Sequence, residues 1–138
     1  MIRYKLYQDN RTNSSKKGYW YARAVNEETY DTEKLARHMA EHNTPYSAGV
    51  IKGVLTDMIS CIKELMLDGK NVKLNDLAIF SVGIQSRGSA TLKDFAVSSN
   101  VRGVKLRARA TGRLSVNKIR KEIVLKEYSE YGAETEKP

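Results

Sequence analysis

The feature that most constrains the fold is a long apolar helix predicted over residues 48–67. Its apolar residues recur at intervals of three and four, which is the spacing of one helix face. They are Val50, Ile51, Val54, Leu55, Met58, Ile59, Ile62, Leu65 and Met66. The rest of the chain offers one short helix and one hairpin to cover this face, which is too little. Leaving these side chains exposed would lower the free energy of unfolding by more than a marginally stable domain tolerates. The sequence therefore predicts an obligate dimer.

The segments before this helix predict a mixed α and β fold. Residues 1–30 contain two runs rich in β-branched and aromatic residues, separated by a polar turn segment, and they predict a β-hairpin. Residues 31–43 predict a short helix, with Asp31 or Thr32 as its N-cap. Pro45 ends that helix, because the residue before a proline avoids the helical conformation.

The segments after the long helix predict a β-ribbon followed by a last helix. We expect one strand over residues 72–84, a polar loop or ribbon end over 85–100, and a second strand over 101–110. Residues 112–125 predict a helix, and the acidic residues 126–138 predict a frayed tail.

The net charge of +8 is concentrated in one segment. Residues 70–121 contain twelve Lys and Arg residues but only two acidic residues, Asp76 and Asp94. An ordinary soluble surface mixes the two signs. The segment therefore predicts a polyanionic partner.

The strand predicted over residues 101–110 alternates between apolar and cationic side chains. Lys105, Arg107 and Arg109 share one face of the strand, and the residues between them are apolar or small. Side chains on one face of a strand repeat about every 7 Å, which can match phosphates along a nucleic-acid strand. The alternation favours a phosphate-binding face, with an ordinary solvent-facing strand as the alternative.

Other chemistry receives little support from the sequence, and we expect neither an enzyme nor a cofactor or metal site. His38 and His42 match the spacing of a zinc-protease signature, but the chain has no further histidine to ligate a catalytic zinc. The single cysteine, Cys61, cannot form an internal disulfide, and we expect it to be a buried small hydrophobic residue. No run approaches the roughly 18–20 apolar residues of a membrane-spanning helix, so we expect a cytoplasmic protein.

The order of these elements resembles the HU and integration-host-factor type of bacterial DNA-binding protein. The resemblance rests on the two helices, the DGK turn at 68–70, the strand beginning NVKLNDLAIFSV at 71, and the basic strand VKLRARA at 104. It is closest to the HU-related histone-like branch of Bacteroidetes, whose members begin with an extra hairpin similar to YWYA at 19–22.

This resemblance implies an α+β, HU/IHF-like fold that forms an intertwined homodimer. Residues 1–125 would form the HU-like domain, divided into an N-terminal β-hairpin extension (1–30), a helical dimer body (31–69), a β-ribbon arm (70–111) and a C-terminal helix (112–125). The implied function is that of a nucleoid-associated, histone-like architectural protein that binds double-stranded DNA largely without sequence specificity. The residues expected to contact DNA are Arg87, Arg102, Lys105, Arg107, Arg109, Arg113, Lys118 and Lys121.

The chain departs from the pattern of this family at three places. In the return strand, Ala108 and Ala110 stand where the branch tends to have phenylalanine and proline. The usual glycine–aromatic–glycine turn is replaced by Asp76-Leu77-Ala78, and the ribbon end has no proline, since the prolines are Pro45 and Pro138. The resemblance therefore implies binding through charge rather than kinking of DNA by a proline wedge. Leu92 and Phe95 are apolar residues at the ribbon end, and we expect them to pack on the ribbon or a partner rather than insert between base pairs.

Two functions of other classes remain as alternatives. One is an RNA-binding or ribosome-associated basic protein, which would prefer structured RNA over duplex DNA. The other is an interaction protein that keeps the HU fold and has lost its affinity for DNA.

Overall fold

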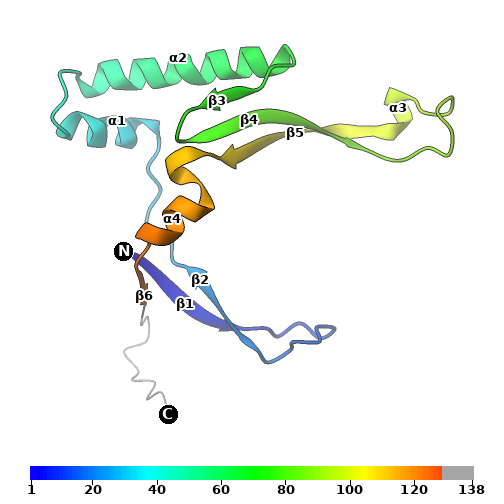
Figure 1. The fold of residues 1–138 in the computed structure, drawn as a ribbon, viewed down its shortest axis with the longest axis horizontal. Helices are drawn as coiled ribbons and strands as arrows, with labels where there is room; N and C mark the ends of the chain where they lie inside the picture. The colour runs from blue at the N-terminus through cyan, green and yellow to red at the C-terminus, as the bar shows by residue number, and fades with distance from the viewer. Residues whose placement is uncertain (129–138) are drawn as a thin grey trace. The chain divides into compact units, whose positions relative to one another are not determined.

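The computed structural model describes residues 1–128, and the chain divides into two compact units. One unit holds residues 30–119 and contains a three-stranded sheet, two helices before it in the chain and a short helix within the ribbon end (Figure 1). The other unit holds residues 1–29 together with the described residues from 120 onward, and it contains a second three-stranded sheet. Most of the expected acidic tail lies outside the described residues.

The first two helices of the larger unit each begin at a residue whose side chain caps the helix. Helix α1 spans Thr32–Glu41, and the Asp31 carboxylate accepts a hydrogen bond at 2.8 Å from the backbone N–H three residues later. Helix α2 spans Ala48–Leu67, and the Ser47 hydroxyl accepts the equivalent bond at 3.2 Å. The predictions of a short helix followed by a long one are therefore confirmed.

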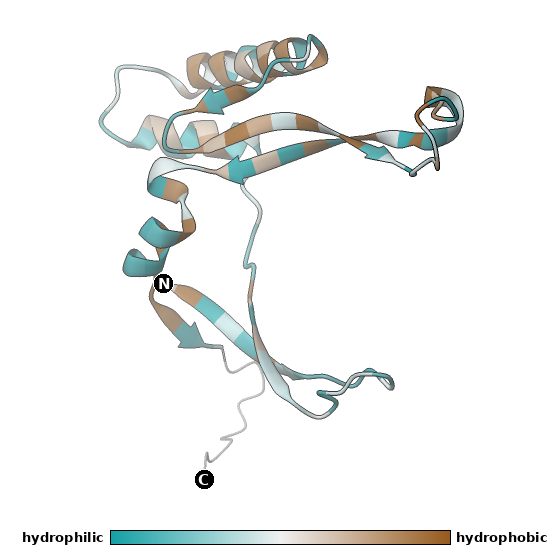
Figure 2. Cartoon of the chain, turned by 45° about the vertical axis from the view of Figure 1, so that its right-hand side comes forward, coloured by the Kyte–Doolittle hydropathy of each residue, from teal (hydrophilic) through white to brown (hydrophobic). Residues whose placement is uncertain are grey.

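Little of the apolar face of α2 is covered by the chain itself. Ala36 of α1 and Ile51 of α2 are buried, whereas Val54 is 63% exposed. Figure 2 shows hydrophobic residues along much of the length of α2. Among residues 1–128 no large side chain is fully buried. Cys61 is exposed, so our expectation that it is buried is wrong for the single chain, because residues 1–128 leave its side chain uncovered.

The sheet of the larger unit forms the predicted ribbon, but its first strand is interrupted. Strands β3 (Val72–Leu74), β4 (Ala78–Ser86) and β5 (Val101–Ala110) pair antiparallel in that order. The expectation of one strand over residues 72–84 is wrong, since a tight turn separates β3 from β4. Asp76 adopts a φ of +65° in that turn, a conformation that Asp tolerates better than most residues.

The same Asp76 fixes the chain segment that follows β5. This segment is a 3₁₀ turn over Gly112–Leu114, and the backbone N–H of Arg113 donates to the Asp76 carboxylate at 3.1 Å. Gly112 has a φ of +58°, and a Cβ added there would overlap the backbone and carboxylate of Asp76. Asp76, which stands in the usual turn motif, therefore links the turn between β3 and β4 to the segment that follows β5.

The last helix is shorter than the sequence predicts. Helix α4 spans Val116–Glu122, whereas we expect residues 112–125, and strand β6 (Leu125–Glu127) follows it directly. Residues 126 and 127 therefore belong to a strand rather than to the expected tail.

The smaller unit is a sheet with the order β2-β1-β6. Strands β1 (Ile2–Gln8) and β2 (Trp20–Ala24) form the predicted hairpin, and β6 pairs parallel to β1. Hydrogen bonds from Ile2 N–H to the Val124 carbonyl and from the Tyr128 N–H to the Tyr4 carbonyl, both 2.8 Å, flank this pairing.

A buried carboxylate organises the hairpin loop. Asp9 is 5% exposed, and its oxygens accept hydrogen bonds from the backbone and guanidinium of Arg11 and from the Ser14 hydroxyl. These donors, with the Arg11 side chain first, hold the pKa of Asp9 far below its usual range. The loop is thus fixed by an ionised aspartate.

We expect Gly112→Ala to lower the free energy of unfolding by about 2 kcal/mol, because the left-handed backbone and the contact with Asp76 both oppose a Cβ. Gly53→Ala on α2 is the matched control, since an added Cβ there meets nothing within 4 Å. It should raise stability by about 0.5–1 kcal/mol through helix propensity. Urea unfolding at one protein concentration measures both, and equal effects of the two substitutions would contradict the role of Asp76.

Candidate nucleic-acid interface

The ribbon of β4 and β5 extends beyond helices α1 and α2 (Figure 1), and its two faces carry different kinds of side chain. Its register is regular from the pair Ala78–Ala110 to the pair Gln85–Gly103. Because side chains alternate between the faces, Phe80, Val82 and Ile84 of β4 lie on the same face as Ala108, Leu106 and Val104 of β5. The cations of β5 lie on the other face.

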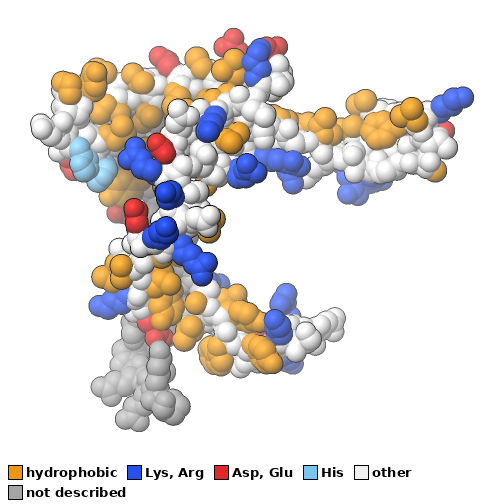
Figure 3. Space-filling view, in the orientation of Figure 1, with side chains coloured by type: hydrophobic (Ala, Val, Ile, Leu, Met, Phe, Trp, Pro, Cys, Tyr) orange, Lys and Arg blue, Asp and Glu red, His pale blue; other side chains and the backbone are white. Residues whose placement is uncertain are grey.

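Lys105, Arg107 and Arg109 form a row on this second face, which we call the cationic face of the ribbon. They pair in register with Gly83, Ser81 and Ile79 of β4, and all three are exposed. Lys and Arg side chains are visible along one side of the ribbon in Figure 3. The side-chain repeat of about 7 Å spaces the charges evenly. The structure thus brings together the three residues that the sequence placed on one face.

Gly83 gives Arg107 room on this face. A Cβ added at Gly83 would overlap the guanidine group of Arg107, so that side chain lies across the backbone of β4. Arg107 is thereby held close along the ribbon surface. Sequence reasoning missed this role of Gly83, although a glycine within a strand is a known signal of close approach.

The other expected contacts near the ribbon end, Arg87 and Arg102, are exposed but do not continue the row. Arg102 is the unpaired residue of a β-bulge, because Gln85 pairs with Gly103 while Ser86 pairs with Val101. The alternation of β5 therefore does not extend to it.

Asn100, at the end of the short helix α3 (Val97–Asn100), closes the ribbon end. Its side-chain amide donates to the carbonyls of Arg87 at 3.1 Å and Gly88 at 3.4 Å, and its oxygen accepts from the Ala96 N–H at 3.0 Å. Asn100 is 8% exposed. Sequence reasoning missed this residue, because nothing distinguishes it from the other polar residues of the segment.

The remaining expected contacts follow the ribbon along the chain. The Arg113 side chain is 86% exposed, and its Nε lies 3.6 Å from the Asp76 carboxylate, which partly offsets its charge. Lys118 and Lys121 are exposed and three residues apart on α4, so they share one side of that helix. They form a separate cationic pair rather than part of the row.

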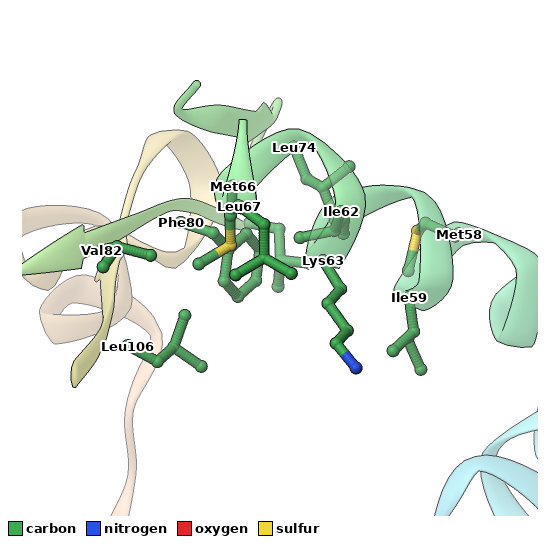
Figure 4. A pocket seen from close by; sticks show the side chains of 11 residues that line it. Met58, Ile59, Ile62, Lys63, Met66, Leu67, Leu74, Phe80, Val82 and Leu106 are labelled. Atoms are coloured by element: carbon green, nitrogen blue, oxygen red, sulfur yellow. The ribbon is translucent and has the colours of Figure 1, made fainter. Parts of the chain in front are cut away.

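The apolar face of the ribbon forms one wall of a groove against α2. The groove has a volume of about 400 Å³ and its lining is almost entirely apolar. Figure 4 shows Ile62 and Met66 of α2 together with Phe80, Val82 and Leu106 of the ribbon around this space. Leu106 is 64% exposed. One face of β5 therefore carries the cations, and the other face is apolar and contributes to the open groove.

The apolar residues of the ribbon end differ in their surroundings. Phe95 is 42% exposed, whereas Leu92 is 93% exposed. Leu92 thus does not pack on its own ribbon, contrary to the expectation, because the loop projects it into solvent. Packing on a partner stays a prediction.

The residues set aside for other chemistry form no reaction centre in the described part of the chain. His38 of α1 and His42, the residue that caps the C-terminus of this helix, have their Nε2 atoms 3.2 Å apart. Within residues 1–128, no group of three or more metal-ligating side chains occurs around them or elsewhere. None of the helices in the same range combines the length and apolar character needed to cross a bilayer.

Comparison with known proteins agrees with this architecture. The chain is similar to a solved protein of Bacteroides vulgatus ATCC 8482, described as a candidate bacterial DNA-binding protein, with a TM-score of 0.65 and 13% sequence identity. The similarity covers 96% of this chain and 50% of that one, so this chain spans about half the length of its neighbour. No curated protein gives a significant match.

A family match covers residues 1–123. The family is HU-HIG, described as an HU domain fused to a wHTH, Ig or glycine-rich motif. The resemblance to the HU type that the element order indicates is thus confirmed, and the chain belongs to the HU-HIG family.

Proposed function

We propose that this protein is a histone-like, architectural DNA-binding protein that grips duplex DNA with its ribbon and acts as a homodimer. The observation that carries the proposal is the cationic face of the ribbon, with Lys105, Arg107 and Arg109 in one row on β5. The role is one of binding rather than catalysis, and it implies association with the bacterial nucleoid.

The geometry of the ribbon favours duplex DNA as its ligand. A two-stranded ribbon fits into a groove of B-form DNA, and a row of cations that repeats about every 7 Å can follow the phosphates of one strand. Phosphate contacts position a protein without reading bases. We therefore infer recognition of DNA shape and charge, largely without sequence specificity.

The relatives of the chain support this assignment. The matched family is defined by an HU domain, and the Bacteroides vulgatus neighbour is described as a candidate DNA-binding protein. The DNA contacts we infer are the cationic face together with Arg87, Arg102, Arg113, Lys118 and Lys121.

The apolar groove between α2 and the ribbon supports the homodimer. Its lining includes Met58, Ile62 and Phe80, and one chain leaves it open. Burying apolar surface contributes about 25 cal/mol per Å², so covering the groove and the exposed side of α2 is a large driving force. A second copy is the occupant we infer, because each copy offers the same apolar helix and ribbon face as complementary cover.

Replacing Lys105, Arg107 and Arg109 together by glutamine should weaken duplex binding equally for unrelated sequences. Each lost phosphate contact lowers the slope of log affinity against log salt by about 0.9, so the slope should fall by nearly three units for one ribbon. Binding titrations at several salt concentrations measure this.

Lys52→Gln on α2 is the control for that triple variant and should leave the slope close to that of the wild-type protein. An unchanged slope in the triple variant would mean that the DNA contacts lie elsewhere, and α4 would be the next candidate. No affinity of the wild-type protein for duplex DNA at low salt would favour the interaction-protein alternative.

Sedimentation should show a mass twice the 15.6 kDa of one chain at micromolar concentration. Leu106→Asp should abolish this dimer, because it places a charge in the apolar groove. Lys105→Asp is the matched control, since it introduces the same carboxylate on the opposite face of β5, and it should leave the mass unchanged. A folded wild-type monomer would contradict the homodimer.

A further inference from the structure

The sheet of the smaller unit has one face that combines cations with aromatic rings. In the register of β1, β2 and β6, Arg3, Lys5 and Tyr7 of β1 share a face with their partners on the neighbouring strands. Those partners are Lys126, Arg23 and Tyr21. Figure 3 shows Lys and Arg side chains interspersed with hydrophobic ones over the β1–β2 hairpin. We call this surface the aromatic face of the sheet.

The rings and cations on the aromatic face are in contact with one another. The ring centroids of Tyr7 and Tyr21 are 5.9 Å apart, and the guanidinium of Arg23 lies 5.2 Å from the Tyr7 centroid. The guanidinium of Arg3 lies 5.0 Å from the ring of Tyr128, which follows β6. Arg3 also bonds Glu27 at 2.6 Å, so part of its charge is offset. The face therefore presents ring surfaces bordered by positive charge.

The opposite face of the same sheet is different in kind. Ile2, Leu6 and Leu125 lie there, together with Trp20, which is 64% exposed. Positive charge is thus confined to the aromatic face instead of being scattered over both sides of the sheet.

A hollow adjoins the aromatic face at the hairpin loop. It has a volume of about 390 Å³ and is lined by Tyr7, Gln8, Asp9, Asn10, Arg11 and Tyr21. The guanidinium of Arg11 is held at its edge by two hydrogen bonds of 3.0 Å to Asp9, while the Arg11 side chain stays 81% exposed. The hollow therefore offers tyrosine rings, an amide from Asn10 and a positioned guanidinium whose charge is partly offset by Asp9.

We propose that the aromatic face and its hollow bind a single-stranded nucleic acid. Unpaired bases stack on Tyr7 and Tyr21, one base enters the hollow beside Arg11, and Arg23 contacts the phosphate backbone. A duplex does not fit this surface as well, because its bases are stacked on one another and do not expose their faces to tyrosine rings. The proposal concerns a site other than the ribbon and does not depend on the ribbon's function.

The test is fluorescence anisotropy of the full chain with labelled oligonucleotides of about 10 nucleotides, within the usual range of single-strand sites. Oligo-dT and oligo-rU are the two arms, because DNA and RNA share the chemistry proposed here. The double variant Tyr7→Leu/Tyr21→Leu removes both rings and should weaken binding by at least about tenfold. Trp20→Leu is the matched control, since it removes an aromatic ring from the opposite face, and it should bind as the wild-type protein does.

Arg23→Gln is a second variant that leaves both tyrosines in place, and it should weaken binding severalfold and reduce its salt dependence. It keeps the proposal testable if the double variant does not fold, which circular dichroism would show. The ribbon variant with three glutamines should retain the aromatic-face binding while it loses duplex affinity. Single-strand binding that survives the loss of both rings, or that falls equally in Trp20→Leu, would overturn the proposal.

Discussion

The apolar surface shared by α2 and the ribbon is the constraint on which the rest of the structure depends. One chain folds α1 onto α2 and lays β3 and β4 beside it, yet buries only small or medium side chains such as Ala36, Ile51 and Ala78. Burial is the main favourable contribution to folding, so a surface of this size left open is unfavourable. The proposed homodimer follows from that imbalance, because a second copy supplies the missing cover.

Strand β5 connects this constraint to the proposed function. The alternation that directs Leu106 toward the groove also directs Lys105 and Arg107 to the opposite side. A shift of the register by one residue would exchange the two faces, placing charge in the groove and apolar side chains on the DNA. The proposed association and the proposed DNA binding thus both depend on the same pairing of β4 with β5.

The sequence predicted the elements that depend on local patterns. The cap Asp31, the period of α2 and the alternation of β5 are each determined within a few residues, and the structure has them as predicted. The features it did not predict depend on contacts distant in the chain. Strand β6 exists because it pairs with β1, and the turn at Asp76 is fixed by a segment 37 residues later. Such pairings leave no periodic signal in a three-residue segment.

The central claim is that DNA and the apolar groove occupy opposite faces of the ribbon. Lys105 lies on the cationic face, whereas Lys63 lines the groove. The most direct measurement is the acetylation rate of these two lysines, followed by mass spectrometry with and without saturating duplex DNA. The account predicts that duplex DNA slows the reaction of Lys105 strongly and leaves the rate of Lys63 unchanged. Equal protection of both lysines, or protection of Lys63 alone, would contradict it.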